Sequence, residues 1–547
     1  MAVFGPQLIY TIIMFVLLAK LGKFYSYGRY LLCHKLYRYL SPNSDDLKKA
    51  VRNHYKSQTK NKKLNRIFEI DDDKEEFNIP EGATVELSMS PVQPADLHYI
   101  KYTDDFQSFV DVSSIAIIIY LSTEIYIAFF KPKDEINLSV VWCSMIILYG
   151  IGSLASIAKN YLRTSEGALL FIFAGVSFIL SLLIQLADTK FFDFQLKDAF
   201  RNVSSNIVNL IQTSMDQNVN VNSAKLPPGT TTTQKIYSQL KTYTTNDLLF
   251  TCFIAFLSSI IGALLFFPSF RLARLHFLCL KYSQESKFKR LVYYLSFILP
   301  LLVSLCWVSI GQNANVVSKA NKTDSNNSVA EQFLNLVVAK NETVNNKNFK
   351  DTFKNLFLNV LLAPNLKIYL ILSVFFLRLV LYRHYAQSYL NLAYEIAASI
   401  RRQSTKLTNV KYMSSISSIY QYYGVVASQY VMPLYILLFM VFLLKTLGDY
   451  TWCGNSEVCN EFVESIANWT ASIRQNTTSS PNIFKKFEST HFNMTQSHDV
   501  LNKILTPYVL RSLIGYFTFW ISTIWFTISC FGLMYYHYID RQFIIEN

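Results

Sequence analysis

The apolar stretch from Val110 to Phe130 constrains this chain more than any other feature of its sequence. It reads VDVSSIAIIIYLSTEIYIAFF, and as an α-helix it would extend about 30 Å, the thickness of the hydrocarbon core of a bilayer. One carboxylate, Glu124, lies well inside it. A charge inside a bilayer costs on the order of 2–3 kcal/mol and normally faces protein or a hydrated cavity. We therefore expect a transmembrane helix inside a bundle, with the other spans packed around it.

The overall composition agrees with a membrane protein and excludes an ordinary soluble domain. The chain of 547 residues is 51% hydrophobic and only 16% charged, and its 42 Phe and 35 Tyr residues are typical of lipid-facing helices with aromatic belts. The net charge of +14 could indicate a nucleic-acid-binding protein. The basic residues collect between apolar spans, however, and this distribution favours anionic lipid as their partner and excludes nucleic acid.

Other apolar segments are also long enough to span a membrane. The pattern predicts about nine spans in total, so the predicted fold class is an all-α, polytopic integral membrane helix bundle. Beside Val110–Phe130, the predicted spans are Phe4–Leu21, Leu138–Ala158, Ala168–Ala187, Leu248–Phe267, Leu291–Ile310, Leu366–Leu381, Val425–Leu447 and Tyr508–Tyr535. The first has no basic n-region and no small-residue cleavage site, which favours a retained anchor; a cleaved signal peptide is the alternative.

Glycosylation signals and basic residues agree on one orientation of the chain. N-x-[ST] sequons occur in the long segments after the fourth, sixth and eighth spans, which share a side if the spans alternate. The predicted glycosylation sites are Asn202, Asn321, Asn326, Asn341, Asn468, Asn476 and Asn493. The opposite segments carry Arg271, Arg274, Arg401 and Arg402 among other basic residues. The positive-inside rule then predicts an N-terminus outside and a cytosolic C-terminus.

These spans and their connections define the predicted organisation of the chain. In order, it comprises the first span (1–21), a cytosolic basic and acidic arm (22–109), spans two to four (110–187), an outer loop (188–247), spans five and six (248–310), an outer glycosylated loop (311–365), spans seven and eight with a cytosolic helical linker (366–447), another outer glycosylated loop (448–507), and span nine with a cytosolic tail (508–547).

The arm reverses its charge along its length. Basic residues, interleaved with aromatic ones from Phe24 to Tyr39, dominate its first part, and the acidic run from Asp71 to Glu76 follows. We expect an amphipathic piece at the membrane interface and then a solvated, disordered arm whose Lys and Arg residues bind anionic lipid. A metal site at Asp71–Asp73 is not predicted, because the spacing and the Gly of an EF-hand loop are absent.

Glu124 requires a partner or a hydrated environment. In the predicted orientation it lies about 9 Å below the outer end of its helix. Arg511, one turn into the last span from the same side, is the first candidate partner, and Lys445, at the outer end of the eighth span, is the second. Arg378 is expected near the inner end of its span, from which it would snorkel to the cytosol. Ion or proton binding and a structural role are both open for this carboxylate.

Two segments, Phe270–Tyr282 and Tyr389–Arg402, are expected to extend transmembrane helices into the cytosol. The second has one apolar helical face, formed by Tyr389, Leu392, Ala393, Ile396 and Ile400. Packing against the bilayer surface is the favoured interpretation, and a docking face or gate is the alternative.

The cysteines predict one disulfide, and catalytic sequence motifs are absent. Cys453 and Cys459 share a sequon-bearing outer loop, and we predict a disulfide between them, worth roughly 2 kcal/mol. The sequence contains no H-E-x-x-H, G-x-S-x-G or P-loop motif. It therefore predicts no catalytic residue, no cofactor, no metal site and no enzymatic activity.

Short segments in most of the spans, in chain order, carry a resemblance to a known family. They read STEIY at Ser122–Tyr126, FKP at Phe130–Pro132, LSVVWC at Leu138–Cys143, FPSFRLARLH at Phe267–His276, AQSYLNLA at Ala386–Ala393, SQYVMPL at Ser428–Leu434, LLKTLGDYTW at Leu443–Trp452 and LTPYVLRSL at Leu505–Leu513. On these segments the chain resembles the transmembrane protein 161 family. Its longer loops between spans four and five and between six and seven, and its Cys453–Cys459 pair, depart from the vertebrate pattern.

The resemblance implies a polytopic, glycosylated membrane protein with no established enzymatic activity, associated with the regulation of ion currents, calcium handling and stress resistance. We expect it to act through a partner channel or pump. The alternative is an ion channel or secondary transporter that uses Glu124 as its coupling or permeation ligand, and a lipid-acting membrane enzyme is a third interpretation. The plasma membrane is favoured as its location, with the endoplasmic reticulum as the alternative.

The predicted topology places a tag at the C-terminus in the cytosol. Protease added to intact cells should leave that tag uncut, because the membrane protects it, and should remove it only after permeabilisation. Immunoblotting before and after detergent measures this. A tag lost from intact cells, or a glycan attached within residues 22–109, would contradict the orientation.

Overall fold

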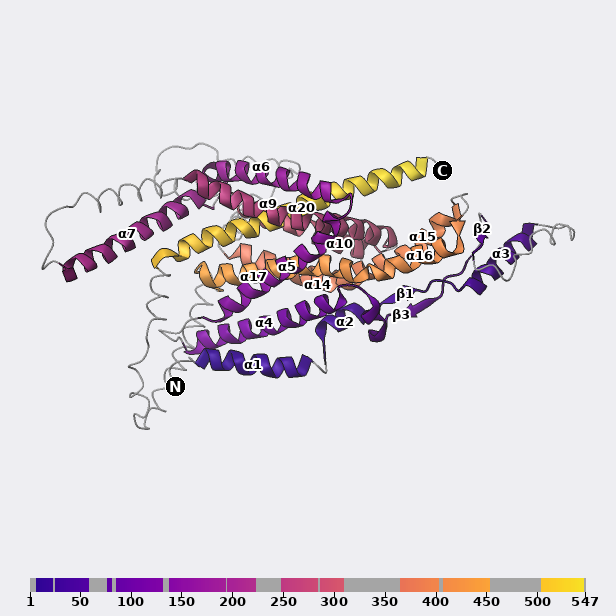
Figure 1. Ribbon diagram of the computed structural model, residues 1–547, viewed down its shortest axis with the longest axis horizontal. Helices are drawn as coiled ribbons and strands as arrows, with labels where there is room; N and C mark the ends of the chain where they lie inside the picture. Colours follow the sequence, from indigo (N-terminus) through magenta and orange to yellow (C-terminus); the bar gives the residue numbers. More distant parts are fainter. Residues whose placement is uncertain are drawn as a thin grey trace, which may run out of the picture.

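Long α-helices dominate the structure. A computed structural model describes residues 6–22, 25–58, 76–80, 85–130, 137–192, 194–222, 247–283, 286–308, 365–402, 407–452 and 503–545. The helices that run along the long axis of the molecule form a bundle (Figure 1). They are α1 (Pro6–Gly22), α4 (Thr103–Phe130), α5 (Ser139–Leu162), α6 (Gly167–Phe191), α9 (Asp247–Tyr282), α10 (Lys287–Leu305), α14 (Leu366–Leu390), α17 (Tyr423–Leu447) and α20 (Pro507–Ile545).

Seven helical segments of the described chain are long and apolar enough to cross a membrane. They are α4, α5, α6, α9, α10, the continuous run of α16 (Asn409–Gln421) into α17, and α20. The predicted all-α, polytopic membrane fold is thus confirmed. The remaining predicted spans correspond to α1, which has 17 residues, and to α14, which contains Arg378 and Arg383. The total of about nine crossings stays a prediction.

The two ends of the bundle can be distinguished by the chain termini. Figure 1 shows α1 beginning at one end, here called the N-terminal end, and α20 finishing at the other, here called the C-terminal end. A chain that crosses the membrane an odd number of times must have its two termini at opposite ends of the bundle, as they are here. The assignment of the N-terminal end to the outside and of the C-terminal end to the cytosol remains a prediction.

The centre of the bundle is α17, not the helix that contains Glu124. Every residue from Tyr423 to Leu444 is buried, and α17 contacts α4, α5, α9, α14 and α20. A helix that is apolar on all sides is expected in such a position. By contrast, α4 lies at the edge of the bundle beside α1, and its Leu121 and Ile125 are 48% and 59% exposed. The prediction that the other spans surround Val110–Phe130 is therefore wrong.

Much of the segment predicted as a solvated arm is folded against the C-terminal end of the bundle. Its elements are α2 (Tyr27–Cys33), β1 (Tyr37–Tyr39), α3 (Ser44–Gln58), β2 (Asn78–Ile79), β3 (Met89–Pro91) and η2 (Pro94–Tyr99). β1 pairs antiparallel with β3, and β2 pairs with β4 (Leu407–Thr408). Leu32, Leu36 and Leu47 are fully or almost fully buried. Burial of Leu47 explains why disorder is the wrong expectation for α3, whereas Leu32 and Leu36 lie in the part predicted as an interfacial piece. Residues 59–75, which include Asp71–Asp73, lie outside the described part.

One basic residue of the arm has a defined structural role. The Arg38 guanidinium lies 3.0 Å from the Asp96 carboxylate and 4.3 Å from the centre of the Tyr420 ring. Arg38 therefore connects β1 to η2 and α16, and is not available as a freely solvated lipid contact.

The predicted inward extensions differ from each other. Phe270–Tyr282 continues α9 without interruption, which confirms the helical extension; its location in the cytosol stays a prediction. The other segment breaks at Asn391, and α15 (Leu392–Arg402) follows as a separate helix. Leu392 and Ala393 of its predicted apolar face are buried against the protein.

Residues 188–247, predicted as an outer loop, contain the helix α7 (Leu196–Asn222). The buried Asp188 at the end of α6 holds the start of this helix. Its Oδ1 accepts a hydrogen bond from the Phe194 amide (3.2 Å), and its Oδ2 accepts one from the Leu196 amide (2.8 Å). A carboxylate at a helix N-terminus satisfies amide groups that have no partner within the helix.

Close backbone packing at the start of α17 generates a test of the fold. A Cβ atom added to Gly424 would lie 2.5 Å from the Lys101 carbonyl oxygen, whereas one added to Gly152 of α5 would meet nothing within 4 Å. Gly424→Ala should lower stability by on the order of 1–3 kcal/mol through overpacking. Gly152→Ala should be neutral or slightly stabilising, since Ala favours helix by up to about 1 kcal/mol.

Thermal unfolding of the two purified variants in detergent, followed by size-exclusion chromatography, measures the difference. Equal midpoints for the two variants would show that α17 does not pack against the Lys101 backbone as described.

Candidate functional site

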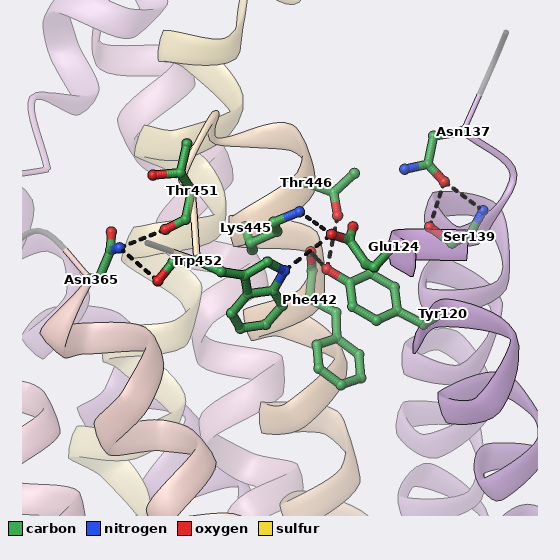
Figure 2. Close-up of polar contacts among 10 residues, drawn as sticks. All are labelled: Tyr120, Glu124, Asn137, Ser139, Asn365, Phe442, Lys445, Thr446, Thr451 and Trp452. Carbon is green, nitrogen blue, oxygen red and sulfur yellow. Dashed lines mark hydrogen bonds and ion pairs between the residues drawn. The ribbon is translucent and has the colours of Figure 1, made fainter. Parts of the chain in front are cut away.

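Glu124 lies near the C-terminus of α4, at the N-terminal end of the bundle. Tyr120 is four residues earlier, so the helical repeat places both side chains on one face. Figure 2 shows them directed toward the end of α17. The Tyr120 ring stacks on Phe442 with centroids 4.1 Å apart, and its hydroxyl lies 3.1 Å from Thr446 Oγ1. These contacts fix the face of α4 that carries the carboxylate.

The Glu124 carboxylate is paired within the protein. Its Oε2 forms an ion pair with Lys445 Nζ and accepts a hydrogen bond from Trp452 Nε1 at 3.1 Å (Figure 2). The two charged side chains are only 13% and 15% exposed. The Lys445 ammonium also lies 5.4 Å from the centre of the Trp452 ring. The charge of Glu124 is thus compensated by one cation and one indole N–H.

A second set of hydrogen bonds holds Trp452 in place. Asn365 Nδ2, at the start of α14, donates to the Thr451 carbonyl (2.5 Å) and to the Trp452 carbonyl (3.4 Å). The Tyr369 hydroxyl donates to the same Trp452 carbonyl. The cluster therefore joins α4, α17 and α14 at one end of the bundle (Figure 2). Below, Glu124, Lys445 and Trp452 are called the carboxylate clamp.

Arg511, the first partner predicted for Glu124, lies elsewhere. Its guanidinium stacks on Tyr450 at 4.3 Å, and it lines a separate cavity of about 200 Å³ together with Lys367 and Trp307. The predicted Glu124–Arg511 pair is therefore wrong, whereas Lys445, the second candidate, is the partner. Glu124 and Arg511 were expected at similar depths in the membrane, and this was the reason for pairing them. However, α17 lies between α4 and α20 and contacts both, so it separates the two side chains.

The expectation that Arg378 snorkels to the cytosol is also wrong. The side chain is 3% exposed, and its guanidinium lies 4.2 Å from the centre of the Trp525 ring. Nε and Nη2 point to the Ser296 carbonyl at 3.4 and 3.5 Å. The reason is helix length: α14 continues to Leu390, so Arg378 lies in the middle of the helix and cannot reach its end.

The other predicted site residues are placed only in part. Asn202 lies in α7, where its side-chain oxygen accepts a hydrogen bond from Asn206. Those that lie outside the described residues are Asn321, Asn326, Asn341, Asn468, Asn476, Asn493, Cys453 and Cys459. Their glycosylation and disulfide stay predictions. No group of three His, Cys, Asp or Glu side chains that could hold a metal ion occurs among the described residues. The absence of enzymatic activity stays a prediction.

Sequence reasoning missed Trp452 and Asn365. Trp452 follows Lys445 in the segment LLKTLGDYTW, so its closeness to that residue was visible. Its orientation toward Glu124 depends on Asn365 and Tyr369, which are distant in sequence, and no local pattern encodes such a contact.

Comparison with known proteins gives a consistent assignment. A family model described as predicted transmembrane protein 161AB matches residues 2–340 and 337–540, which together cover nearly the whole chain. No solved structure matches the chain.

The carboxylate clamp predicts coupling between Glu124 and Lys445. Glu124→Gln and Lys445→Met should each lower the free energy of unfolding, by roughly 1–3 kcal/mol for this partly buried pair, because each leaves one charge without its partner. The double variant should lose clearly less than the sum of the two.

Arg511→Gln serves as the control for this cycle. Its effect should add to that of Glu124→Gln, since the two side chains do not touch. Thermal unfolding of the purified variants measures all five combinations. Additivity in the Glu124–Lys445 cycle, or coupling in the Glu124–Arg511 cycle, would refute the assignment.

Proposed function

The chain belongs to the transmembrane protein 161 family, and we propose that it is a non-enzymatic, multi-pass membrane protein that modulates ion currents or calcium handling through a partner channel or pump. Membership and the helix bundle establish a membrane protein with several apolar helices. The modulatory role is our extension of what the family resemblance implies.

The internal pairing of Glu124 is the observation that supports a modulator over a transporter. A coupling or permeation ligand must exchange its partner for an ion, whereas this carboxylate is held by Lys445 and Trp452. The cavities around Arg271, Pro433 and Arg511 are all lined by residues other than Glu124. The central helix, buried from Tyr423 to Leu444, presents no solvated face along which an ion could pass. Glu124 and Lys445 thus connect α4 to α17.

A different observation favours the alternative, an ion channel or secondary transporter. Arg378 Nη1 and His276 Nε2 are buried without a hydrogen-bond partner, although both lie inside the bundle. The His276 ring is connected to the Arg378 backbone through Tyr385 and Tyr430: His276 Nδ1 lies 3.3 Å from the Tyr385 hydroxyl, and Tyr430 donates to the Arg378 main-chain carbonyl at 2.8 Å. Buried polar atoms without partners are rare and can mark a hydrated path. The alternative, a channel or transporter that uses Glu124, thus gains Arg378 as a second candidate group.

Further properties belong to the same proposal. We expect glycosylation at the outer sequons and contact of the basic residues from Lys48 to Arg66 with anionic lipid. The plasma membrane is the favoured location, and the endoplasmic reticulum is the alternative. A lipid-acting enzyme remains the third interpretation, with no catalytic group assigned to it.

Flux measurements with the purified protein separate the first two functions. In sealed liposomes the protein alone should give no K⁺, Ca²⁺ or H⁺ flux above that of empty liposomes, because a modulator needs its partner. An ionophore added at the end checks that the vesicles are sealed. Affinity purification from native membrane should in turn recover a channel or pump.

The transporter alternative predicts the opposite result. Flux without a partner that Arg378→Gln abolishes, while Arg511→Gln leaves it intact, would replace the modulator proposal. Comparable expression of both variants keeps the comparison interpretable.

A further inference from the structure

A cavity of about 700 Å³ lies toward the C-terminal end of the bundle, remote from the carboxylate clamp. Helices α9, α14, α15, α16, α17 and α20 and the junction of α5 with α6 form its walls. Its volume lies in the range of about 300–1,000 Å³ that is usual for sites of small organic ligands. The walls are mainly aromatic and aliphatic, with Phe266, Phe270, Tyr389 and Tyr536 among them. Such a cavity accommodates a ligand with a substantial apolar part.

Two guanidinium groups give the cavity a positive charge. Arg271 and Arg274 both line it, and they are three residues apart on α9, so they occupy neighbouring positions on one helical face. The Glu166 carboxylate also belongs to the lining. Among the described residues, however, no carboxylate lies within ion-pair distance of either guanidinium, in contrast to Lys281, which pairs with Glu395 at 3.1 Å. The lining thus carries two guanidinium groups against one carboxylate, and neither guanidinium forms an ion pair with a described carboxylate.

Neutral side chains hold Arg271 in position. Its Nη2 donates a hydrogen bond to the Tyr161 hydroxyl at 2.7 Å, and its guanidinium carbon lies 5.9 Å from the centre of the Tyr422 ring. The Tyr161 ring stacks on Phe267 with centroids 4.1 Å apart. The guanidinium is therefore oriented without being neutralised. The N–H donors of a guanidinium that is oriented but not neutralised match the oxygens of a phosphate group in geometry and charge.

The position of the cavity indicates where the ligand comes from. Three lining residues, Leu169, Tyr422 and Tyr535, are 50%, 53% and 51% exposed, so the cavity reaches the surface of the bundle. Several of its walls are tyrosines, which concentrate at the level of lipid headgroups in membrane proteins. A ligand with a phosphate at this level and apolar chains in the bilayer is a phospholipid.

We propose that this cavity binds one anionic phospholipid, whose phosphate contacts Arg271 and Arg274 and whose acyl chains lie along the aromatic wall. The site is separate from the carboxylate clamp, and the inference does not depend on the proposed modulatory function. Free inorganic phosphate offers the same headgroup chemistry without acyl chains, so the experiment must compare the two.

Thermal unfolding and native mass spectrometry of the full chain in detergent provide the test. Phosphatidic acid should raise the unfolding temperature and give one retained lipid per protein. Phosphatidylcholine with the same acyl chains should bind at least about tenfold more weakly than phosphatidic acid, because its choline compensates the phosphate charge. Inorganic phosphate at the same concentration should give no shift. Equal effects of the two lipids, or an equal effect of inorganic phosphate, would overturn the proposal.

Matched variants locate the bound lipid. Arg271→Gln combined with Arg274→Gln should weaken phosphatidic acid binding by about tenfold or more. The control, Lys287→Gln combined with Arg290→Gln, removes two exposed charges from the first turn of α10 and should bind like the wild type. Retained binding in the first pair, or equal loss in both, would overturn the assignment to this cavity.

A third variant covers the case in which the double arginine variant fails to fold. Ser418 lines the cavity without contributing charge. Ser418→Trp should fill part of the volume and reduce lipid retention while both guanidinium groups remain. Wild-type retention in a folded Ser418→Trp protein would count against the site.

Discussion

The burial of α17 from Tyr423 to Leu444 is the constraint on which the rest of the structure depends. In a bilayer, lipid tails are as apolar as Leu side chains, so close van der Waals packing and polar contacts between helices must favour association. Gly150 of α5 permits such packing: a Cβ atom there would lie 2.9 Å from Ile436 of α17. Between α6, α9 and α20, hydroxyl groups add hydrogen bonds. Tyr516 reaches both Ser181 (2.7 Å) and Ser258 (3.2 Å).

The sequence revealed the spans but not their neighbours. Hydropathy depends only on local composition, so the apolar helices and the continuation of α9 through Tyr282 were predictable. The partner of Glu124 was not, because depth in a bilayer limits the candidates to Lys445 and Arg511 without saying which helix lies between. Arg378 was misplaced for a local reason, since the residues that extend α14 to Leu390 are polar enough to resemble a loop. The folded arm was missed because its buried leucines are scattered among many charges.

Two charged sites, one toward each end of the bundle, differ in how their charge is compensated, and this difference limits what each can do. At the N-terminal end, Glu124 and Lys445 are mutually compensated, so the clamp gains nothing from an added ion. Toward the C-terminal end, Arg271 is oriented by Tyr161 but is not neutralised. A guanidinium near the level of lipid headgroups keeps partial access to water and to anionic lipid, which makes an uncompensated charge tolerable there. The ion pair at one end therefore connects helices, whereas the guanidinium groups toward the other end form a cationic site that is open to an anionic ligand.

Arg378 shows how a charge in the middle of the bundle can specify assembly. Its environment is contributed by different helices: Trp525 from α20, the Ser296 carbonyl from α10, and Tyr430 of α17, which binds the Arg378 carbonyl. An isolated α14 would expose this cation to lipid, at a cost on the order of 2–3 kcal/mol or more. The Trp525 ring and the Ser296 carbonyl reduce that cost, because both contact the guanidinium. They can do so only after α20 and α10 have packed against α14. A helix that is unfavourable alone and favourable in one arrangement disfavours alternative packings, and this is how the buried cation of α14 can specify the arrangement of α10, α17 and α20 around it.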